Sequence, residues 1–396
     1  MLLDGMKIVS FCHFLQGPAA MQYLGDMGAE IIKIEPPQGA YERHWAGAGG
    51  AKVNGVSAFY LAANRNARSI AIDLKKPDAR DVVFRLVGQA HAVAENFRPG
   101  ALDRLGLGYD AVRARKPDII YASASGYGST GPYARRPGQD LLIQAMSGLV
   151  SANGGGPARS TAIGCAAVDQ HGGALLAIGI LGAYVKWLRT GEGTRVEASL
   201  LGAGIDLQIE SLVTYYAAAM GDHAFERQEN LATWFHEAPY GVYPVADGHM
   251  AISLNPLEKL ARALDTDVFA PFLGGDPFAE RDAIAALVAA ELKDRRFADL
   301  AAAFEAEAMW YARVETFDDL PENPQLVHNG TFGEIEVDGA RARIVNHPNR
   351  YDGQCPDRRH FALRQGADTR AILEEAGFAA TEIAELLKGG VVHAPV

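Results

Sequence analysis

The sequence contains little cysteine, no excess of positive charge and no long hydrophobic run. Its three cysteines, Cys12, Cys165 and Cys355, lie far apart without a C-x-x-C pair, which argues against a disulfide framework or a zinc site. Lys and Arg number 37 against 48 Asp and Glu, a formal charge of −11. A protein that coats nucleic acid or an anionic membrane needs a broad positive face, so we expect small-molecule ligands and no nucleic-acid partner.

The sequence also shows no pattern of a secretory signal or of a membrane-spanning helix. Residues 1–5 are not a basic stretch followed by an apolar one, so no secretory signal is expected. The longest apolar run, 172–185, is shorter than the roughly 20 residues that a membrane-spanning helix needs, and it indicates a buried helix. We therefore expect a cytoplasmic protein with no membrane partner.

The first 200 residues alternate short β-branched runs with helical patterns. Strand, helix and strand at this spacing predict parallel pairing through right-handed crossovers, and hence an open α/β sheet of the Rossmann type. Such sheets bind ligands at the carboxyl ends of their strands. The expected strands are 7–11, 30–34, 69–74, 90–95 and 118–123.

The pattern changes after residue 200 and suggests a second domain. Alternating apolar residues on either side of Asp-Gly turns predict hairpins in the later part of the chain. We expect a large domain over 1–200 completed by about 360–396, a linker helix over 201–224, a smaller α+β domain over 225–325, and a returning linker with a hairpin over 326–359.

Two motifs with chemical associations are interpreted as structural. Residues 126–131 read G-x-G-x-x-G after a strand, but Pro132 follows where the helix of a dinucleotide site should continue, so a plain glycine turn is favoured. A nucleotide-binding α/β protein that uses this turn stays an alternative. None of the eleven histidines has another four residues away, and His236-Glu237 lacks the second histidine of H-E-x-x-H, which argues against a metal site.

Asp169 lies where a loop enters the long apolar helix. A carboxylate there can accept backbone N–H bonds at the positive end of the helix dipole, so we expect it to be ionised at pH 7. An aspartate N-cap is also a routine structural device, and spacing alone favours that interpretation. Gly172 and Gly173 leave room for a substrate to approach the backbone, so catalysis is the competing hypothesis.

Cations gather between residues 64 and 104, where eight bases stand against five acids. Several lie beside predicted strand ends, where a phosphorylated ligand would bind. Arg80 fits a solvated helix face, whereas Lys75, Arg98 and Arg104 are equally compatible with a surface role and with phosphate binding.

Several segments of the first 200 residues match the motifs of a known protein family in order and spacing, and the carboxyl-terminal part matches that family more loosely. They are 3–9, 16–18, 24–35, 66–75, 95–100, 104–106, 125–128, 136–140 and the Asp169 segment. With these segments the chain resembles the class III CoA transferases (CaiB/BaiF type), a family that includes formyl-CoA transferase, carnitine CoA transferase and α-methylacyl-CoA racemases.

The resemblance implies an enzyme that moves CoA from an acyl-CoA thioester to a carboxylic acid. Asp169 then corresponds to the nucleophile, which attacks the thioester, releases CoA thiolate and forms a mixed aspartyl anhydride. A carboxylate with a pKa of about 4 is already ionised and needs no general base. Binding energy from the CoA moiety must offset the reactive anhydride, and water must be excluded.

The resemblance also implies residue roles and an assembly. Gln16 corresponds to an active-site glutamine near the reacting carbonyl, Asp140 to a second acid in the site, and Trp45 and Tyr60 to the acyl pocket. The implied assembly is a homodimer of ring-like chains threaded through each other. The CoA-contacting set, with cations for the phosphates and Phe97 against the adenine or pantetheine, is Lys75, Asn96, Phe97, Arg98, Ala101, Arg104 and Arg136.

The chain departs from the family pattern at two places. Pro36-Pro37 stands where members often have arginine, so one CoA contact must be replaced or lost. Gln139 stands where the racemases have a histidine, and glutamine has no proton to exchange near neutral pH, so an acyl-CoA racemase or isomerase is the disfavoured alternative. Residues 225–240 offer aromatics in place of the glycine-rich lid of formyl-CoA transferase, so oxalate is not the obvious acceptor, and the sequence does not identify the two acids.

Overall fold

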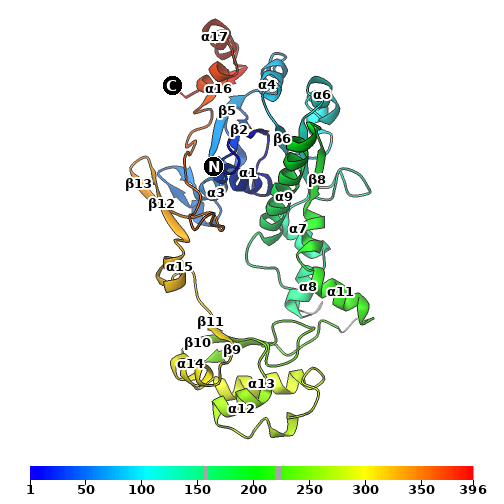
Figure 1. Cartoon of the computed structure of the whole chain (residues 1–396), viewed down its shortest axis with the longest axis vertical. Helices are drawn as coiled ribbons and strands as arrows, with labels where there is room; N and C mark the ends of the chain where they lie inside the picture. The colour runs from blue at the N-terminus through cyan, green and yellow to red at the C-terminus, as the bar shows by residue number, and fades with distance from the viewer. Residues whose placement is uncertain (156–158, 220, 222–223, 396) are drawn as a thin grey trace. The chain divides into compact units, whose positions relative to one another are not determined.

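The computed structural model describes residues 1–155, 159–219, 221 and 224–395 (Figure 1). The chain divides into two compact units. The larger unit comprises Met1–Ile143, Cys165–Leu207 and Pro324–Val396, and the smaller comprises Gln144–Gly164 and Gln208–Asn323.

A seven-stranded sheet forms the centre of the larger unit as described, and all its strands except the edge strand β14 run parallel to their neighbours. This confirms the predicted open α/β sheet. The chain builds outward from β1 in one direction and then from β6 in the other, so the strand order reverses between β1 and β6. Across the sheet the strands are β14 (Val392–His393), β5 (Ala67–Ile72), β2 (Glu30–Glu35), β1 (Lys7–Ser10), β6 (Ala92–Glu95), β7 (Ile120–Ser125) and β8 (Arg195–Ser199).

Helices cover both faces of this sheet (Figure 1). Because side chains alternate along a strand, Ile8 and Ile31 pack on one face with α1 (Gln16–Asp26) and α9 (Ala167–Thr190). Val9 and Ile32 lie in the core of the other face. The helices on that face are α4 (Ala79–Gly88), α6 (Tyr109–Arg115), α16 (Thr369–Glu375) and α17 (Ala380–Lys388).

Shorter elements complete the larger unit. The hairpin of β12 and β13 confirms the one predicted in the returning segment. These elements are α2 (Tyr41–His44), β3 (Lys52–Val53), β4 (Val56–Ser57), α3 (Ala58–Ala63), α5 (Ala101–Arg104), the start of α7 (Asp140–Met146), α10 (Leu200–Asp206), α15 (Pro324–His328), β12 (Phe332–Val337) and β13 (Ala340–Val345).

The smaller unit packs helices on a three-stranded antiparallel sheet. Its β9–β10 hairpin turns at Asp247-Gly248, as predicted. The elements are α8 (Leu149–Gly154), α11 (Ile209–Ala217), β9 (Gly241–Val245), β10 (Gly248–Ile252), α12 (Leu257–Leu264), α13 (Arg281–Leu292), α14 (Phe297–Ala306) and β11 (Tyr311–Arg313).

The linker helix expected over 201–224 is interrupted. Helix α10 ends at Asp206 and α11 begins at Ile209. Gln208 between them leaves the helical conformation, with φ −115° and ψ 19°, and its side-chain amide donates to the backbone oxygen of Ser147 at 2.9 Å. A side-chain bond to a distant segment thus overrides the helical propensity of the sequence.

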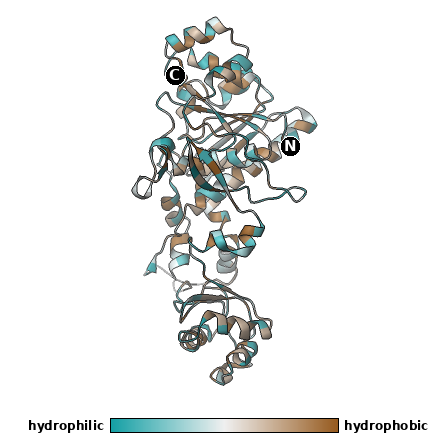
Figure 2. Ribbon diagram, turned by 90° about the vertical axis from the view of Figure 1, so that its left-hand side faces the viewer, coloured by the Kyte–Doolittle hydropathy of each residue, from teal (hydrophilic) through white to brown (hydrophobic). Residues whose placement is uncertain are grey.

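Helix α9 is the long helix expected from the apolar run. Among the described residues, α9 is the one helix whose length and apolar composition would be sufficient to cross a membrane. One face of it packs against α1 and the sheet through Leu176, Ile180 and Tyr184, so the expected buried helix is buried on that face only. Figure 2 shows that the helices of the chain carry both hydrophobic and hydrophilic residues.

The close contact between α1 and α9 depends on glycine. A Cβ added at Gly173 would lie 2.8 Å from the backbone oxygen of Gln16 and 3.0 Å from Cβ of Ala19. We expect Gly173→Ala to lower the free energy of unfolding by about 1–3 kcal/mol, because backbone cannot yield as a side chain can. Gly88→Ala is the control, since no atom lies within 4 Å of its added Cβ. In thermal unfolding the control should match or exceed wild type, and equal stability of the Gly173 variant would contradict the expectation.

Candidate active site

The amino-terminal end of α9 carries Asp169 in its first turn, but Asp169 is not the residue that caps it. Asp140 Oδ1 accepts the backbone N–H of Val168 at 2.8 Å and that of Asp169 at 3.0 Å. Ala166, the residue before the helix, offers no capping side chain. The N-cap interpretation of Asp169 is therefore wrong, because the capping carboxylate comes from the start of α7, 29 residues earlier in the chain.

The Asp169 carboxyl is left without a hydrogen-bonding partner among the described residues, and it is partly buried. Burial and the neighbouring Asp140 charge raise the pKa of Asp169 to about 7. The expectation of a carboxylate with a pKa of about 4 is thus wrong for the free chain. Near neutral pH the protonated and ionised forms coexist, so the amount of nucleophilic carboxylate changes with pH in this range.

Gln16 begins α1 and meets α9 one turn beyond Asp169. Its side chain is buried, with 4% exposed, and its amide nitrogen Nε2 has no hydrogen-bond partner in the described residues. A Cβ added at Gly172 would lie 2.8 Å from that nitrogen. Because residues three apart share a helix face, the amide lies on the side of α9 that carries Asp169. A buried amide donor without a partner is costly, which marks it as a candidate ligand contact.

The loop after β1 joins Gln16 to the position where the strand order reverses. Asn96 accepts the backbone N–H of His13 at 2.8 Å and donates to the backbone oxygen of His13 at 2.7 Å. The ring of Phe97 lies edge-on to that of His13, with centroids 5.4 Å apart. Open parallel sheets bind ligands outside the carboxyl ends of the strands at such a reversal, here β1 and β6.

A cavity of about 150 Å³ lies beside the carboxyl ends of β6 and β7. Phe97, Arg98 and Ala101, three of the expected CoA contacts, line it, together with Arg195 and Glu197 of β8, which sequence reasoning missed. The cavity is thus built by the loop after β6, by α5, and by strands β7 and β8.

The other expected CoA contacts do not line this cavity. Lys75 and Arg104 are exposed, and Asn96 is engaged with the His13 backbone. Arg136 is exposed with its guanidinium 4.2 Å from the centroid of the Tyr133 ring.

The sequence matches the family described as CoA-transferase family III over residues 3–369. The chain belongs to this family. It is therefore an enzyme that transfers CoA between acids, as the sequence resemblance implied.

Known family III proteins are similar along most of the chain. An acyl-CoA transferase of Fusarium pseudograminearum is 31% identical, covering 98% of this chain and 88% of its own length. A succinate–glutarate CoA-transferase of Agrobacterium fabrum is 29% identical, covering 89% of this chain and 92% of its own length. The crystal structure of a CAIB/BAIF family protein from Brucella suis superposes with a TM-score of 0.82 at 30% identity, covering 94% of this chain and 99% of that protein.

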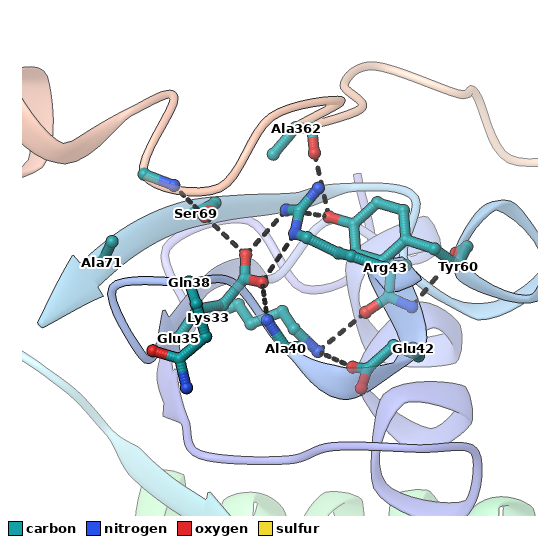
Figure 3. Close-up of polar contacts among 12 residues, drawn as sticks. Lys33, Glu35, Gln38, Ala40, Glu42, Arg43, Tyr60, Ser69, Ala71 and Ala362 are labelled. Atoms are coloured by element: carbon teal, nitrogen blue, oxygen red, sulfur yellow. Dashed lines mark hydrogen bonds and ion pairs between the residues drawn. The ribbon is translucent and has the colours of Figure 1, made fainter. Parts of the chain in front are cut away.

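Of the two family III pocket residues expected, the structure places Tyr60 in the interior. Its side chain has no exposed surface, its hydroxyl accepts from Arg43 Nη2 at 2.7 Å, and it donates to the backbone oxygen of Ala362 at 3.0 Å (Figure 3). Trp45 is 45% exposed, with its ring edge-on to Phe59. Tyr60 therefore supports the fold in this chain, whereas Trp45 has a surface that a ligand can contact.

Residues 126–139 contain no helix, as the glycine-turn interpretation requires. Gly126 packs against the backbone of Gly138, since an added Cβ would lie 2.6 Å from its Cα. Gln139, which distinguishes this chain from the racemases, is exposed beside Asp140. In the described residues no group of three or more His, Cys, Asp or Glu side chains could hold a metal ion.

Three polar residues near the site gave no signal in the sequence. His13 is partly buried, and burial together with the Lys33 charge lowers its pKa to about 4, so its imidazole is neutral at pH 7. Lys33 and Glu42 form a buried ion pair behind the same loop. No spacing rule points to them, because strand β2 and helix α2 bring them together only in the fold.

Proposed function

We propose that this chain moves CoA from an acyl-CoA to a carboxylic acid through a mixed anhydride on Asp169. The observation that carries the proposal is the Asp169 carboxyl: it is partly exposed, without a partner in the described residues, and beside the unpartnered Gln16 amide. A carboxylate oxygen attacks the thioester carbonyl carbon, the C–S bond breaks, and the CoA thiolate leaves with the electron pair. The Gln16 amide donates a hydrogen bond to the oxyanion that develops.

The later steps reverse this chemistry on a second acid. The thiolate attacks the aspartyl carbonyl of the anhydride and releases the donor acid, leaving CoA as a thioester of Asp169. The acceptor carboxylate attacks that thioester, again expelling thiolate and forming a new anhydride. Thiolate attack on its acyl carbon then gives the new acyl-CoA and restores the carboxylate, so atoms and charge balance over the cycle.

CoA binding is proposed for the loop after β6 and the cations around it. Phe97 and Ala101 offer apolar contact in the cavity, and Arg98 at its rim faces the solvent from which phosphates approach. Lys75 and Arg104 are exposed cations that can accompany Arg98, since flexible surface cations pair readily with phosphate. Arg136 is proposed for the same role.

We also infer a homodimer, with interlocked chains as the family resemblance implies. Helix α9 exposes Ile178 and Leu188 by 62% and 61%, and a monomer rarely leaves such a stripe uncovered. Light scattering should give about twice the 42.3 kDa of one chain. Ile178→Glu should lower that mass or the yield of folded protein, whereas Arg80→Glu on the exposed face of α4 should change neither. A monomeric wild type would overturn the inference.

The covalent intermediate provides the test of the proposed function. Wild type incubated with an acyl-CoA and hydroxylamine should form a hydroxamate on Asp169, located by mass spectrometry of the digested protein. Deuterium entering the acyl α-carbon without exchange of CoA would instead support an isomerase. A nucleotide-binding protein without transferase activity would show neither signal, and an adduct on another residue would contradict the assigned nucleophile.

A further inference from the structure

A buried ion pair lies between strand β2 and helix α2, behind the loop that leads to Gln16. The side chains of Lys33 and Glu42 are 4% and 0% exposed, and Lys33 Nζ lies 2.7 Å from Glu42 Oε1 (Figure 3). The same ammonium donates to the backbone oxygen of Cys12 and to Asn64 Oδ1, both at 2.9 Å. All three ammonium protons therefore have acceptors.

The pair and Asn96 together fix the backbone of residues 12–14. Lys33 holds the oxygen of Cys12, and Asn96 holds both polar groups of His13. Glu42 Oε2 accepts the backbone N–H of Phe14 at 3.2 Å. Three consecutive residues of the loop are thus held by side chains from three separate segments, β2, α2 and the loop after β6.

The conformation held in this way is strained. Phe14 has a φ of 63°, in the left-handed region that large side chains rarely adopt, and its side chain is 54% exposed. Packing of the Phe14 ring does not account for the strain, because most of the ring faces solvent. Such backbone persists only where surrounding contacts over-determine it, and it is common at functional sites. Two residues later the chain enters α1 at Gln16.

We propose that Glu42 is a positioning residue of the transferase, which acts with Lys33 to hold residues 12–14 so that the Gln16 amide stays beside Asp169. The inference rests on the proposed function, because it gives the loop a role in that reaction. A buried ion pair is a weak device for stability, since desolvation offsets much of the attraction. What the pair does at this loop is fix the backbone geometry of Cys12 and Phe14.

Substitution by glutamine breaks this arrangement at one defined point. Both carboxylate oxygens of Glu42 face donors, the Lys33 ammonium on one side and the Phe14 N–H on the other. A glutamine side chain presents one oxygen and one NH2 group, so its NH2 must face one of the two donors. The charged Lys33 ammonium competes better for the single oxygen than a neutral N–H does, so the NH2 group faces Phe14 and the loop loses its acceptor.

The test compares Glu42→Gln with Asp26→Asn. Asp26 ends the same helix that Gln16 begins, and it is equally buried in an ion pair with Arg65 at 2.6 Å. Both variants should unfold at lower temperature. Only Glu42→Gln should lower kcat, by roughly 10- to 100-fold per folded molecule, with KM for acyl-CoA changed less than about threefold. Equal kcat losses in the two variants would show a merely structural role and overturn the proposal.

A second variant keeps the test decisive if Glu42→Gln folds poorly. Lys33→Met with Glu42→Leu removes both charges and should recover stability without recovering kcat, because Cys12 and Phe14 still lack their partners. Recovery of kcat along with stability would overturn the proposal. Hydrogen exchange of the Phe14 amide reports on the loop independently of catalysis, and it should be faster in Glu42→Gln and in the double variant than in wild type. If the proposed function itself is wrong, wild type will show no CoA exchange, and this outcome is distinguishable from a failure of the positioning role of Glu42.

Discussion

We expect Asp169→Asn to remove CoA transfer and at the same time to stabilise the protein above pH 7. The amide has no carboxylate oxygen to attack the thioester, so kcat should fall on the order of 10³-fold or more. The side chains have the same shape, and the Asp140 cap uses only the backbone N–H of residue 169. The fold should therefore survive, and hydroxylamine trapping should show no adduct at this position.

The sign of the stability change follows from the raised pKa of Asp169, about 7 in the fold against an ordinary 3.8. The folded chain holds this proton more tightly, so the contribution of Asp169 is most favourable at low pH and declines as pH rises from about 4 to about 7. Asparagine does not titrate. The variant should thus unfold at a higher temperature than wild type at pH 8, with the difference shrinking towards pH 4.

Asp26→Asn should change the stability at pH 8 in the opposite direction to Asp169→Asn. Despite its burial, hydrogen bonds from His347 and Arg65 hold the pKa of Asp26 below its ordinary value. Its stabilising contribution is present at pH 8 and declines as the pH falls through the folded pKa, so this variant should be less stable than wild type at pH 8. Thermal unfolding at both pH values measures the contrast. A less stable Asp169→Asn protein at pH 8 would show that the carboxylate is better solvated than its pKa implies.

The sheet was predictable because its signals are local. Runs such as Ser69 to Leu74 alternate with helical patterns at the spacing of crossover units, and parallel pairing follows from that order. Strand β2 also shows the limit of pattern reasoning. Lys33 and Glu35 occupy positions that an alternating strand would give to solvent, yet both are buried, because Glu42 and Arg43 of α2 pair with them.

The candidate site was predictable in composition but not in geometry. Asp169 could be located from its place before an apolar helix, whereas its raised pKa comes from burial in the fold and from Asp140 of a separate helix. No local sequence signal distinguishes an aspartate whose side chain caps its own helix from one in a helix that a distant aspartate caps. Gln16 and Asp140 were identified only through the family resemblance, and what the fold adds is which backbone or side chain each one meets.

The second large effect is expected at Asp140, whose carboxylate caps α9 and also raises the pKa of Asp169. Asp140→Asn separates these two roles, because the amide oxygen can still accept the N–H groups of Val168 and Asp169 while the charge is lost. Since kcat/KM reports ionisations of the free enzyme, its rise with pH should have a midpoint near 7 in wild type and a lower one in Asp140→Asn. The variant should then be relatively more active at pH 6.

Asp140→Ala removes the cap as well as the charge, and the comparison assigns each consequence. The two N–H groups at the start of α9 lose their acceptor, which should cost about 0.5–2 kcal/mol of stability. The pH midpoint of the rise in kcat/KM should also be lower in Asp140→Ala than in wild type. The maximum value of kcat/KM should be smaller in this variant, because the helix turn that carries Asp169 is less well held. A midpoint that stays near 7 in Asp140→Asn would mean that burial alone raises the pKa of Asp169, and the coupling between the two carboxyl groups would then have no part in setting the pH dependence of acylation.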